Sequence, residues 1–129
     1  MQFNNSYSLI QKFAATLLML LVASTAFAHT GLKESTPAAD TTVHAVPSKI
    51  DLVFNGPVRL VKLEVTSAGQ AVDTEFKPSA EPTATFSIPA AGLVAGSYTV
   101  DWAVIGEDGH TVSNSFSFIV DPSATSSTP

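Results

Sequence analysis

Apolar and polar residues alternate along several short segments of the chain, as in strands that bury one face. The clearest segment is 49–55, in which Ile50, Leu52 and Phe54 fall on one side. The other rows of alternate apolar residues are Val61, Leu63 and Val65; Ala84, Phe86 and Ile88; Tyr98, Val100, Trp102 and Val104; and Phe116, Phe118 and Val120. These rows predict strands, and we expect Trp102 and the phenylalanines to form their shared core.

Turn residues separate the rows. Residues 67–70 predict a turn into a further strand over 71–76, Pro89 closes the row before it, and Ala95-Gly96 precedes the row that contains Trp102. Outside the first 28 residues, apolar residues do not recur at helical spacing for long. Six or seven strands of this kind favour an all-β fold with two antiparallel sheets packed face to face, as in an immunoglobulin-like β-sandwich.

The first 28 residues predict a secretory signal peptide. Lys12 is followed by an apolar run over 13–22 and then by Ala26-Phe27-Ala28, the small-residue pattern of a cleavage site. The run has about ten residues, half of what a membrane span needs, so a retained anchor is the weaker interpretation. Cleavage after Ala28 leaves a domain over 29–120 and a Ser/Thr/Pro-rich tail over 121–129, which we expect to be disordered.

Composition restricts the partners and the metal chemistry. The full chain has a net charge of −5, and loss of Lys12 with the signal makes the mature chain more acidic. This charge argues against nucleic acids and anionic membranes as partners and suits a soluble protein or one that handles cations. We expect the protein to be a monomer. There is no cysteine, and both methionines, Met1 and Met19, lie in the signal, so the mature chain offers no sulfur ligand.

Cleavage at the predicted position would make His29 the first residue of the mature chain. Its free amine and its imidazole can close a six-membered chelate ring on one metal ion. The pKa values of these two groups, roughly 8 and 6.5, make loss of their protons easy near neutral pH.

A second group of donors stands in Glu107-Asp108-Gly109-His110. In an extended segment residues two apart point to the same side, so Asp108 and His110 could face one ion, with Gly109 free to adopt a backbone angle that other residues resist. Together with His29 these donors are rich in nitrogen and include one carboxylate, a set that suits copper(II). Zinc would accept them with lower affinity, and copper(I) prefers sulfur.

Plainer interpretations stand beside the metal site. An Asp-Gly-His triplet in a loop is usually only a turn, and a histidine after a cleavage site is often accidental; only the combination points to a metal. We expect His44, in the connection 41–47, to be exposed, with an auxiliary ligand role as the alternative.

Taken in order, these segments resemble the CopC family of periplasmic copper-resistance proteins over about residues 29–120. A histidine follows the signal. The matching segments after it are Ser35-Thr36-Pro37-Ala38, Lys49–Phe54 as K-I-x-L-x-F, Gly96–Trp102 as G-x-Y-x-V-x-W, Asp108-Gly109-His110, and Ser113–Phe118 as the following strand. No single segment is specific, but the ordered set is.

The resemblance implies a Greek-key β-sandwich or barrel of about seven strands that binds one copper(II) ion through His29 (amine and imidazole), Asp108 and His110. It also implies a carrier or buffer in periplasmic copper homeostasis that exchanges copper with an inner-membrane transporter, and not an enzyme. Some members place an acidic residue where this chain has Asn55-Gly56, and others carry a Met-rich copper(I) segment that is missing from this sequence.

Two other functions stay open. An N-terminal histidine with a second histidine resembles the histidine brace of lytic polysaccharide monooxygenases, which would make the protein an oxidative copper enzyme. Against this, Asp108 would occupy a coordination position and the chain is short for a polysaccharide-binding face. The other alternative, a metal-free immunoglobulin-like interaction module, would show no copper-dependent rise in melting temperature.

Overall fold

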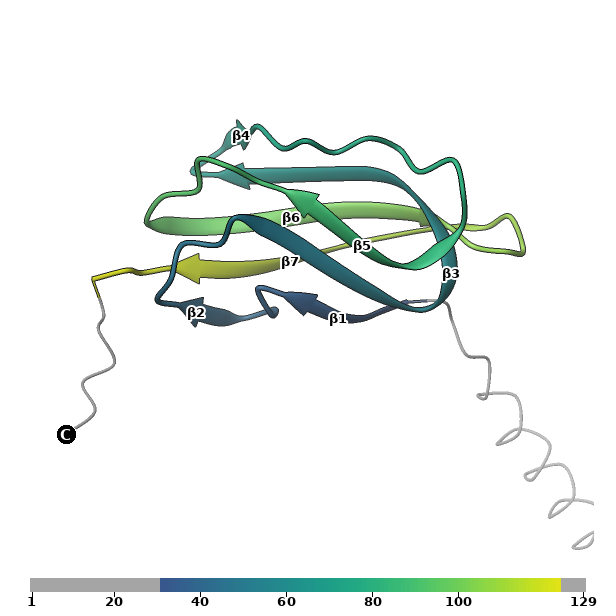
Figure 1. Ribbon diagram of the computed structural model, residues 1–129, viewed down its shortest axis with the longest axis horizontal. Helices are drawn as coiled ribbons and strands as arrows, with labels where there is room; N and C mark the ends of the chain where they lie inside the picture. Colours follow the sequence, from purple (N-terminus) through teal and green to yellow (C-terminus); the bar gives the residue numbers. More distant parts are fainter. Residues whose placement is uncertain (1–30, 124–129) are drawn as a thin grey trace, which may run out of the picture.

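The computed structural model describes residues 31–123, which form a β-sandwich of seven strands (Figure 1). The strands are β1 (Leu32–Thr36), β2 (Thr41–Val43), β3 (Lys49–Ser67), β4 (Gln70–Val72), β5 (Thr83–Pro89), β6 (Gly96–Ile105) and β7 (Thr111–Val120). The all-β sandwich expected from the sequence is confirmed. Over the described range, no helix is long and apolar enough to cross a membrane.

The long strand β3 organises the fold because both layers use it. Its first half lies between β1 and β5 and pairs antiparallel with each of them. Its second half pairs with β6, and its last residues also pair with β4. The second layer continues from β6 to β7 and then to β2, which runs parallel to β7 and departs from the expected antiparallel pattern. Pairing with β5 shifts register between Val53 and Val58, around Pro57, whose lack of an N–H suits an interrupted ladder.

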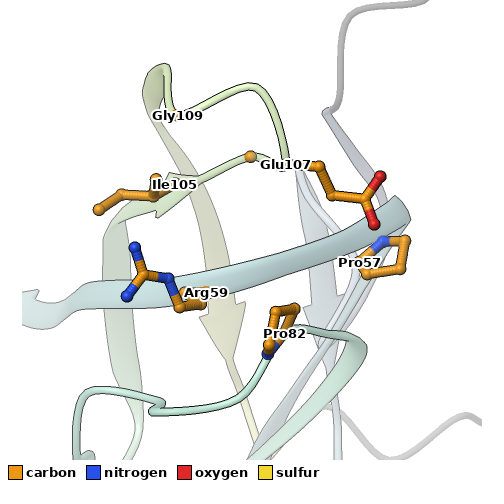
Figure 2. A pocket seen from close by; sticks show the side chains of 7 residues that line it. Pro57, Arg59, Pro82, Ile105, Glu107 and Gly109 are labelled. Carbon is orange, nitrogen blue, oxygen red and sulfur yellow. The ribbon is translucent and has the colours of Figure 1, made fainter.

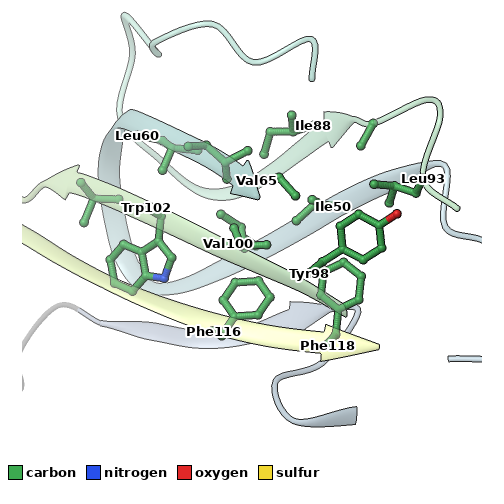
Figure 3. Packing of buried hydrophobic residues seen from close by; sticks show 14 of the residues in the cluster. Ile50, Leu60, Val65, Ile88, Leu93, Tyr98, Val100, Trp102, Phe116 and Phe118 are labelled. Atoms are coloured by element: carbon green, nitrogen blue, oxygen red, sulfur yellow. The ribbon is translucent and has the colours of Figure 1, made fainter. Parts of the chain in front are cut away.

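The core lies between the two layers. Ile50 and Leu52 are fully buried and Phe54 is nearly so, as the alternation predicted, and the whole row from Tyr98 to Val104 is buried at its alternate positions. Figure 3 shows Ile50, Val100 and Trp102 with Ile88 of β5 and Phe116 of β7 in the space between the ribbons. The rings of Tyr98 and Phe118 stack with centroids 5.4 Å apart. The prediction that the aromatic residues build the core is confirmed for Trp102 and for Phe54, Phe116 and Phe118.

The row predicted from Val61, Leu63 and Val65 is wrong at its first position. Leu60 is fully buried whereas Val61 is only half-buried, because pairing of β3 with β6 shifts register between Leu60 and Lys62. Such a β-bulge inserts one residue and moves the alternation by one position. The sequence carries no sign of this bulge, since Leu60 and Val61 are both apolar.

The strand predicted over 71–76 is wrong in extent, because β4 ends at Val72. Its register along β3 pairs Val72 with Val65, so one more step would place Asp73 opposite Glu64. Like charges directly opposite each other destabilise a strand pair. The chain therefore leaves the sheet, although Phe76 still packs half-buried against the core. β1 and β2 were not predicted, because neither short strand has a row of alternate apolar residues.

Candidate metal site

The loop between β6 and β7 brings Asp108 and His110 into direct contact. Oδ2 of Asp108 lies 2.9 Å from Nδ1 of His110, and Oδ1 accepts a hydrogen bond from the backbone N–H of His110 at 3.0 Å. Both side chains are largely exposed, with 69% of Asp108 and 85% of His110 open to solvent. The two residues are therefore accessible to an ion that arrives from solution.

A turn, and not the extended segment assumed from the sequence, produces this contact. The backbone N–H of Gly106 donates to the carbonyl of His110, and that of Gly109 donates to the carbonyl of Gly106, each at 3.0 Å. Gly109 has a φ of 81°, in the left-handed region that side chains with a Cβ resist. The expected conformational role of Gly109 is confirmed, and the carboxylate of Asp108 closes the turn by bonding two residues ahead.

Asp108 and His110 shift each other's pKa. The side-chain hydrogen bond with His110, followed by the bond from its backbone N–H, lowers the pKa of Asp108. The same side-chain bond, followed by the negative charge of Asp108, raises the pKa of His110. Because Nδ1 faces the carboxylate, Nε2 is the nitrogen of His110 that remains free for another partner. A metal ion at this imidazole competes with a proton, so binding weakens as pH falls.

Two donors are too few for a protein metal site. Across residues 31–123, no three His, Asp or Glu side chains come together in an arrangement that could hold a metal ion. His29 and the predicted cleavage site after Ala28 lie outside the described residues. Any further His, Asp or Glu ligand of a site built on Asp108 and His110 would therefore come from outside that range.

The described chain begins at the same end of the sandwich as the β6–β7 loop (Figure 1). The carbonyl of Gly31 accepts a hydrogen bond of 3.0 Å from the backbone N–H of Asn55, where β3 bends. On one side of this bend Phe54 pairs with Leu32, and on the other side Arg59 pairs with Ile105, the last residue of β6. The bend of β3 thus connects the start of β1 to the start of the loop that carries Asp108 and His110.

His44 lies at the opposite end of the sandwich. It follows β2, and its Nδ1 is 3.0 Å from the carbonyl oxygen of Asp121, just after β7. The ten residues of β7 span roughly 30 Å between that point and His110. His44 is exposed, as expected, but the structure does not bring it together with Asp108 and His110.

An open pocket of about 390 Å³ adjoins the β6–β7 loop (Figure 2). Its walls come from the bend of β3, from Pro82 just before β5, and from the segment that includes Ile105, Glu107 and Gly109. No pattern in the sequence indicates this pocket, because three segments far apart in the chain form it.

Comparison with known proteins adds an identification to this geometry. Residues 32–121 match the model of the CopC domain. Copper resistance protein C of Escherichia coli is 35% identical over 114 residues, which cover 80% of this chain and 90% of that protein. Copper transport protein CutJ of Bacillus subtilis (strain 168) is 27% identical over 111 residues, which cover 81% of this chain but only 20% of that much longer protein.

Solved structures agree with the fold. CopC from Methylosinus trichosporium OB3b superposes with a TM-score of 0.62 at 28% identity, over 75% of this chain and 98% of that one. PcoC, a methionine-rich copper resistance protein from Escherichia coli, superposes with a TM-score of 0.60 at 32% identity, over 73% of this chain and 100% of that one. The likeness thus spans each neighbour almost entirely.

Proposed function

This chain belongs to the CopC family, and from that premise we propose that it binds one copper(II) ion through the amine and imidazole of His29, the carboxylate of Asp108 and the imidazole of His110. The copper-related function of the family supports the choice of metal. The donor set supports the oxidation state, because nitrogen and carboxylate ligands without sulfur favour copper(II) over copper(I).

The observation that carries the proposal is that the described residues begin at the same end of the sandwich as the β6–β7 loop. The Asp108–His110 pair and the first residues of β1 lie at one end of the sandwich, connected by the bend of β3. His29 precedes Gly31 by two residues, and two residues of extended chain reach about 7 Å. Cleavage after Ala28 would therefore leave a metal-chelating terminus on a short tether whose base is fixed at Asn55.

Copper binding by both residues would have to alter the hydrogen bonds between Asp108 and His110. Nε2 of His110 is free, so we expect it to be the donor atom of that imidazole. Asp108 engages His110 through both of its carboxylate oxygens. Nε2 lies on the side of the imidazole ring away from this carboxylate, so ligation of the same ion by Asp108 requires its bond to Nδ1 to open. A retained bond would instead make Asp108 the residue that orients the imidazole. The proposal takes direct ligation.

We also propose that the protein is a carrier or buffer in the periplasm that exchanges copper with a membrane transporter, and that it does not act as an enzyme. The predicted signal peptide supports export. The Escherichia coli relative is a copper resistance protein, and the segment of CutJ that is similar to this chain forms one part of a longer copper transport protein. In CutJ a segment similar to this chain is joined to the rest of a copper transport protein. This arrangement supports copper exchange between this protein and a separate transporter.

The decisive experiment compares two versions of the processed protein. One begins at His29, as verified by mass spectrometry, and the other carries one additional residue before it. We expect the first to bind copper(II) at one equivalent, with several nitrogen donors in its electron paramagnetic resonance spectrum, and the second to bind much more weakly with fewer nitrogens. Equal affinity and equal spectra would remove the terminal donors from the site. Reductant-dependent oxidation of a glycan by the copper-loaded protein would contradict the non-enzymatic role.

A further inference from the structure

The pocket beside the β6–β7 loop contains Arg59, the sole arginine of an acidic chain. Among the ion pairs formed by residues 31–123, Arg59 has no carboxylate partner, although Glu107 lines the same pocket. A guanidinium offers a planar fork of N–H donors that matches a carboxylate in two-point hydrogen bonding. The pocket therefore has one free position for an anionic group from outside the chain.

Figure 2 shows the guanidinium of Arg59 and the carboxylate of Glu107 on opposite sides of the pocket. The rings of Pro57 and Pro82 and the side chain of Ile105 supply apolar surface around them. A cation at one side, an anion at the other and apolar walls complement a molecule with a carboxylate at one end, an ammonium at the other and an apolar body.

We infer that this pocket binds a short zwitterionic peptide, with its C-terminal carboxylate on Arg59 and its N-terminal ammonium toward Glu107. The volume of about 390 Å³ lies at the small end of ligand pockets, which excludes a long peptide. A dipeptide or tripeptide carries these two charges at the two ends of a short body with apolar side chains, which is the occupant that the proposal takes.

The position of the pocket gives this binding a use. Glu107 and Gly109 line it and alternate along the loop with Asp108 and His110, so a bound peptide lies next to the proposed copper site. Amine and amide nitrogens of peptides are donors of the kind that copper(II) prefers. A peptide in the pocket could thus deliver or accept the ion while the protein's own ligands are still in place. This use rests on the proposed function, whereas the binding itself does not.

The test uses copper-free processed protein, so that failure of the copper site leaves it unaffected. L-alanyl-L-alanine is titrated against the ¹⁵N-labelled protein, and backbone amide shifts are followed by NMR. We expect saturable shifts at Arg59, Ile105 and Glu107, and a loss of affinity of about tenfold or more in Arg59→Ala, since hydrogen bonds to charged groups have this magnitude. Lys62→Ala, which removes an exposed cation from the same strand, is the matched control and should bind normally.

Charge variants of the probe separate the two ends of the pocket. The peptide amide, which lacks the carboxylate, should bind the unmodified protein as weakly as Ala-Ala binds Arg59→Ala. The N-acetylated peptide lacks the ammonium group, so it should bind the unmodified protein more weakly than Ala-Ala does. Its affinity should be the same for the Glu107→Gln variant, because the contact with Glu107 is already lost. The inference is overturned if no saturable shift occurs at tens of millimolar peptide, or if Arg59→Ala, with an otherwise unchanged spectrum, binds as tightly as Lys62→Ala.

Discussion

The ring of Trp102 meets the ring of Phe54 edge to face, with centroids 5.2 Å apart and planes at 76°. Trp102 belongs to β6 and Phe54 to the first half of β3, so this contact joins the two layers beside the bend of β3. Phe54 also packs edge to face on Phe86 of β5, at 5.8 Å. Phe54 thus links β5, in its own layer, to β6 in the opposite layer, at the end of the sandwich that carries the candidate metal site.

Phe54→Ala should lower the free energy of unfolding by about 3–5 kcal/mol, because it removes a buried ring and leaves a cavity between the layers. Denaturant titration measures the loss. Trp102 is the sole tryptophan, so its emission should shift to longer wavelength as water reaches the vacated space. Val94→Ala, at a side chain that is 65% exposed, is the control and should cost no more than about 0.5 kcal/mol. Equal losses in the two variants would contradict this account of the core.

Tyr98→Phe should destabilise the protein by about 1–2 kcal/mol without changing copper affinity. The Tyr98 hydroxyl donates to the carbonyl of Val94 at 2.7 Å and accepts from its backbone N–H at 2.8 Å, so the variant leaves two backbone groups without this partner. These bonds lie where β6 begins, at the end of the sandwich opposite the β6–β7 loop. Thermal unfolding and copper titration of the same sample check both parts, and a fall in copper affinity would contradict the separation of the two ends.

His110 of the copper-free protein should titrate above its ordinary pKa of 6.5, because its hydrogen bond to Asp108 and the charge of that carboxylate favour the protonated imidazole. Asp108→Asn removes the charge and should lower the midpoint. NMR of the imidazole C–H signals against pH measures this, with His110→Gln to identify the resonance. An unchanged midpoint in Asp108→Asn would show that the contact of 2.9 Å does not persist in solution.

The same pair should make a small contribution to stability within a limited pH window. The lowered pKa of Asp108 gives a contribution that is present above the ordinary value of 3.8 and disappears as pH falls through the lowered pKa. The raised pKa of His110 gives one that is complete below 6.5 and disappears as pH rises through the raised pKa. The difference in melting temperature between the unmodified protein and His110→Gln should therefore be largest between these two values. It should be small, because both groups are exposed.

Two histidine variants test the position of the copper site. His110→Ala should weaken copper(II) binding by about 100-fold or more, because it removes a proposed ligand. Substitution of a residue that only orients a ligand already lowers metal affinity by about 10–100-fold. His44→Ala should bind as tightly as the unmodified protein, because His44 contacts the Asp121 carbonyl at the other end of the sandwich. Competition with a chelator of known affinity measures both, and a similar loss in the two variants would contradict the assignment.

The sequence predicted the parts of the fold that depend on alternation within one strand. Ile50 and Leu52 were placed correctly in the core because strand periodicity alone decides which face they occupy. Val61 was not, because the bulge that moves it out of register depends on how β3 meets β6. The early end of β4 likewise depends on a cross-strand relation, between Asp73 and Glu64, that no single segment contains.

The candidate site divides in the same way. Asp108 and His110 could be paired from the sequence because they are two residues apart, although the turn that pairs them was not foreseen. The pocket could not be predicted, because Arg59, Pro82 and Glu107 meet only after β3 has bent and β6 has returned alongside it. Whether His29 joins Asp108 and His110 stays a prediction, which the terminal-extension experiment addresses.

The use of β3 by both layers has a mechanical consequence. A sandwich whose sheets have no strand in common can loosen one sheet while the other stays intact, but here the strand that holds β1 and β5 continues into the ladder with β6. Pulling β1 away from Phe54 therefore strains the same polypeptide segment that supports Ile105. The start of β1 and the base of the β6–β7 loop should therefore open and close together, as one cooperative unit in hydrogen exchange.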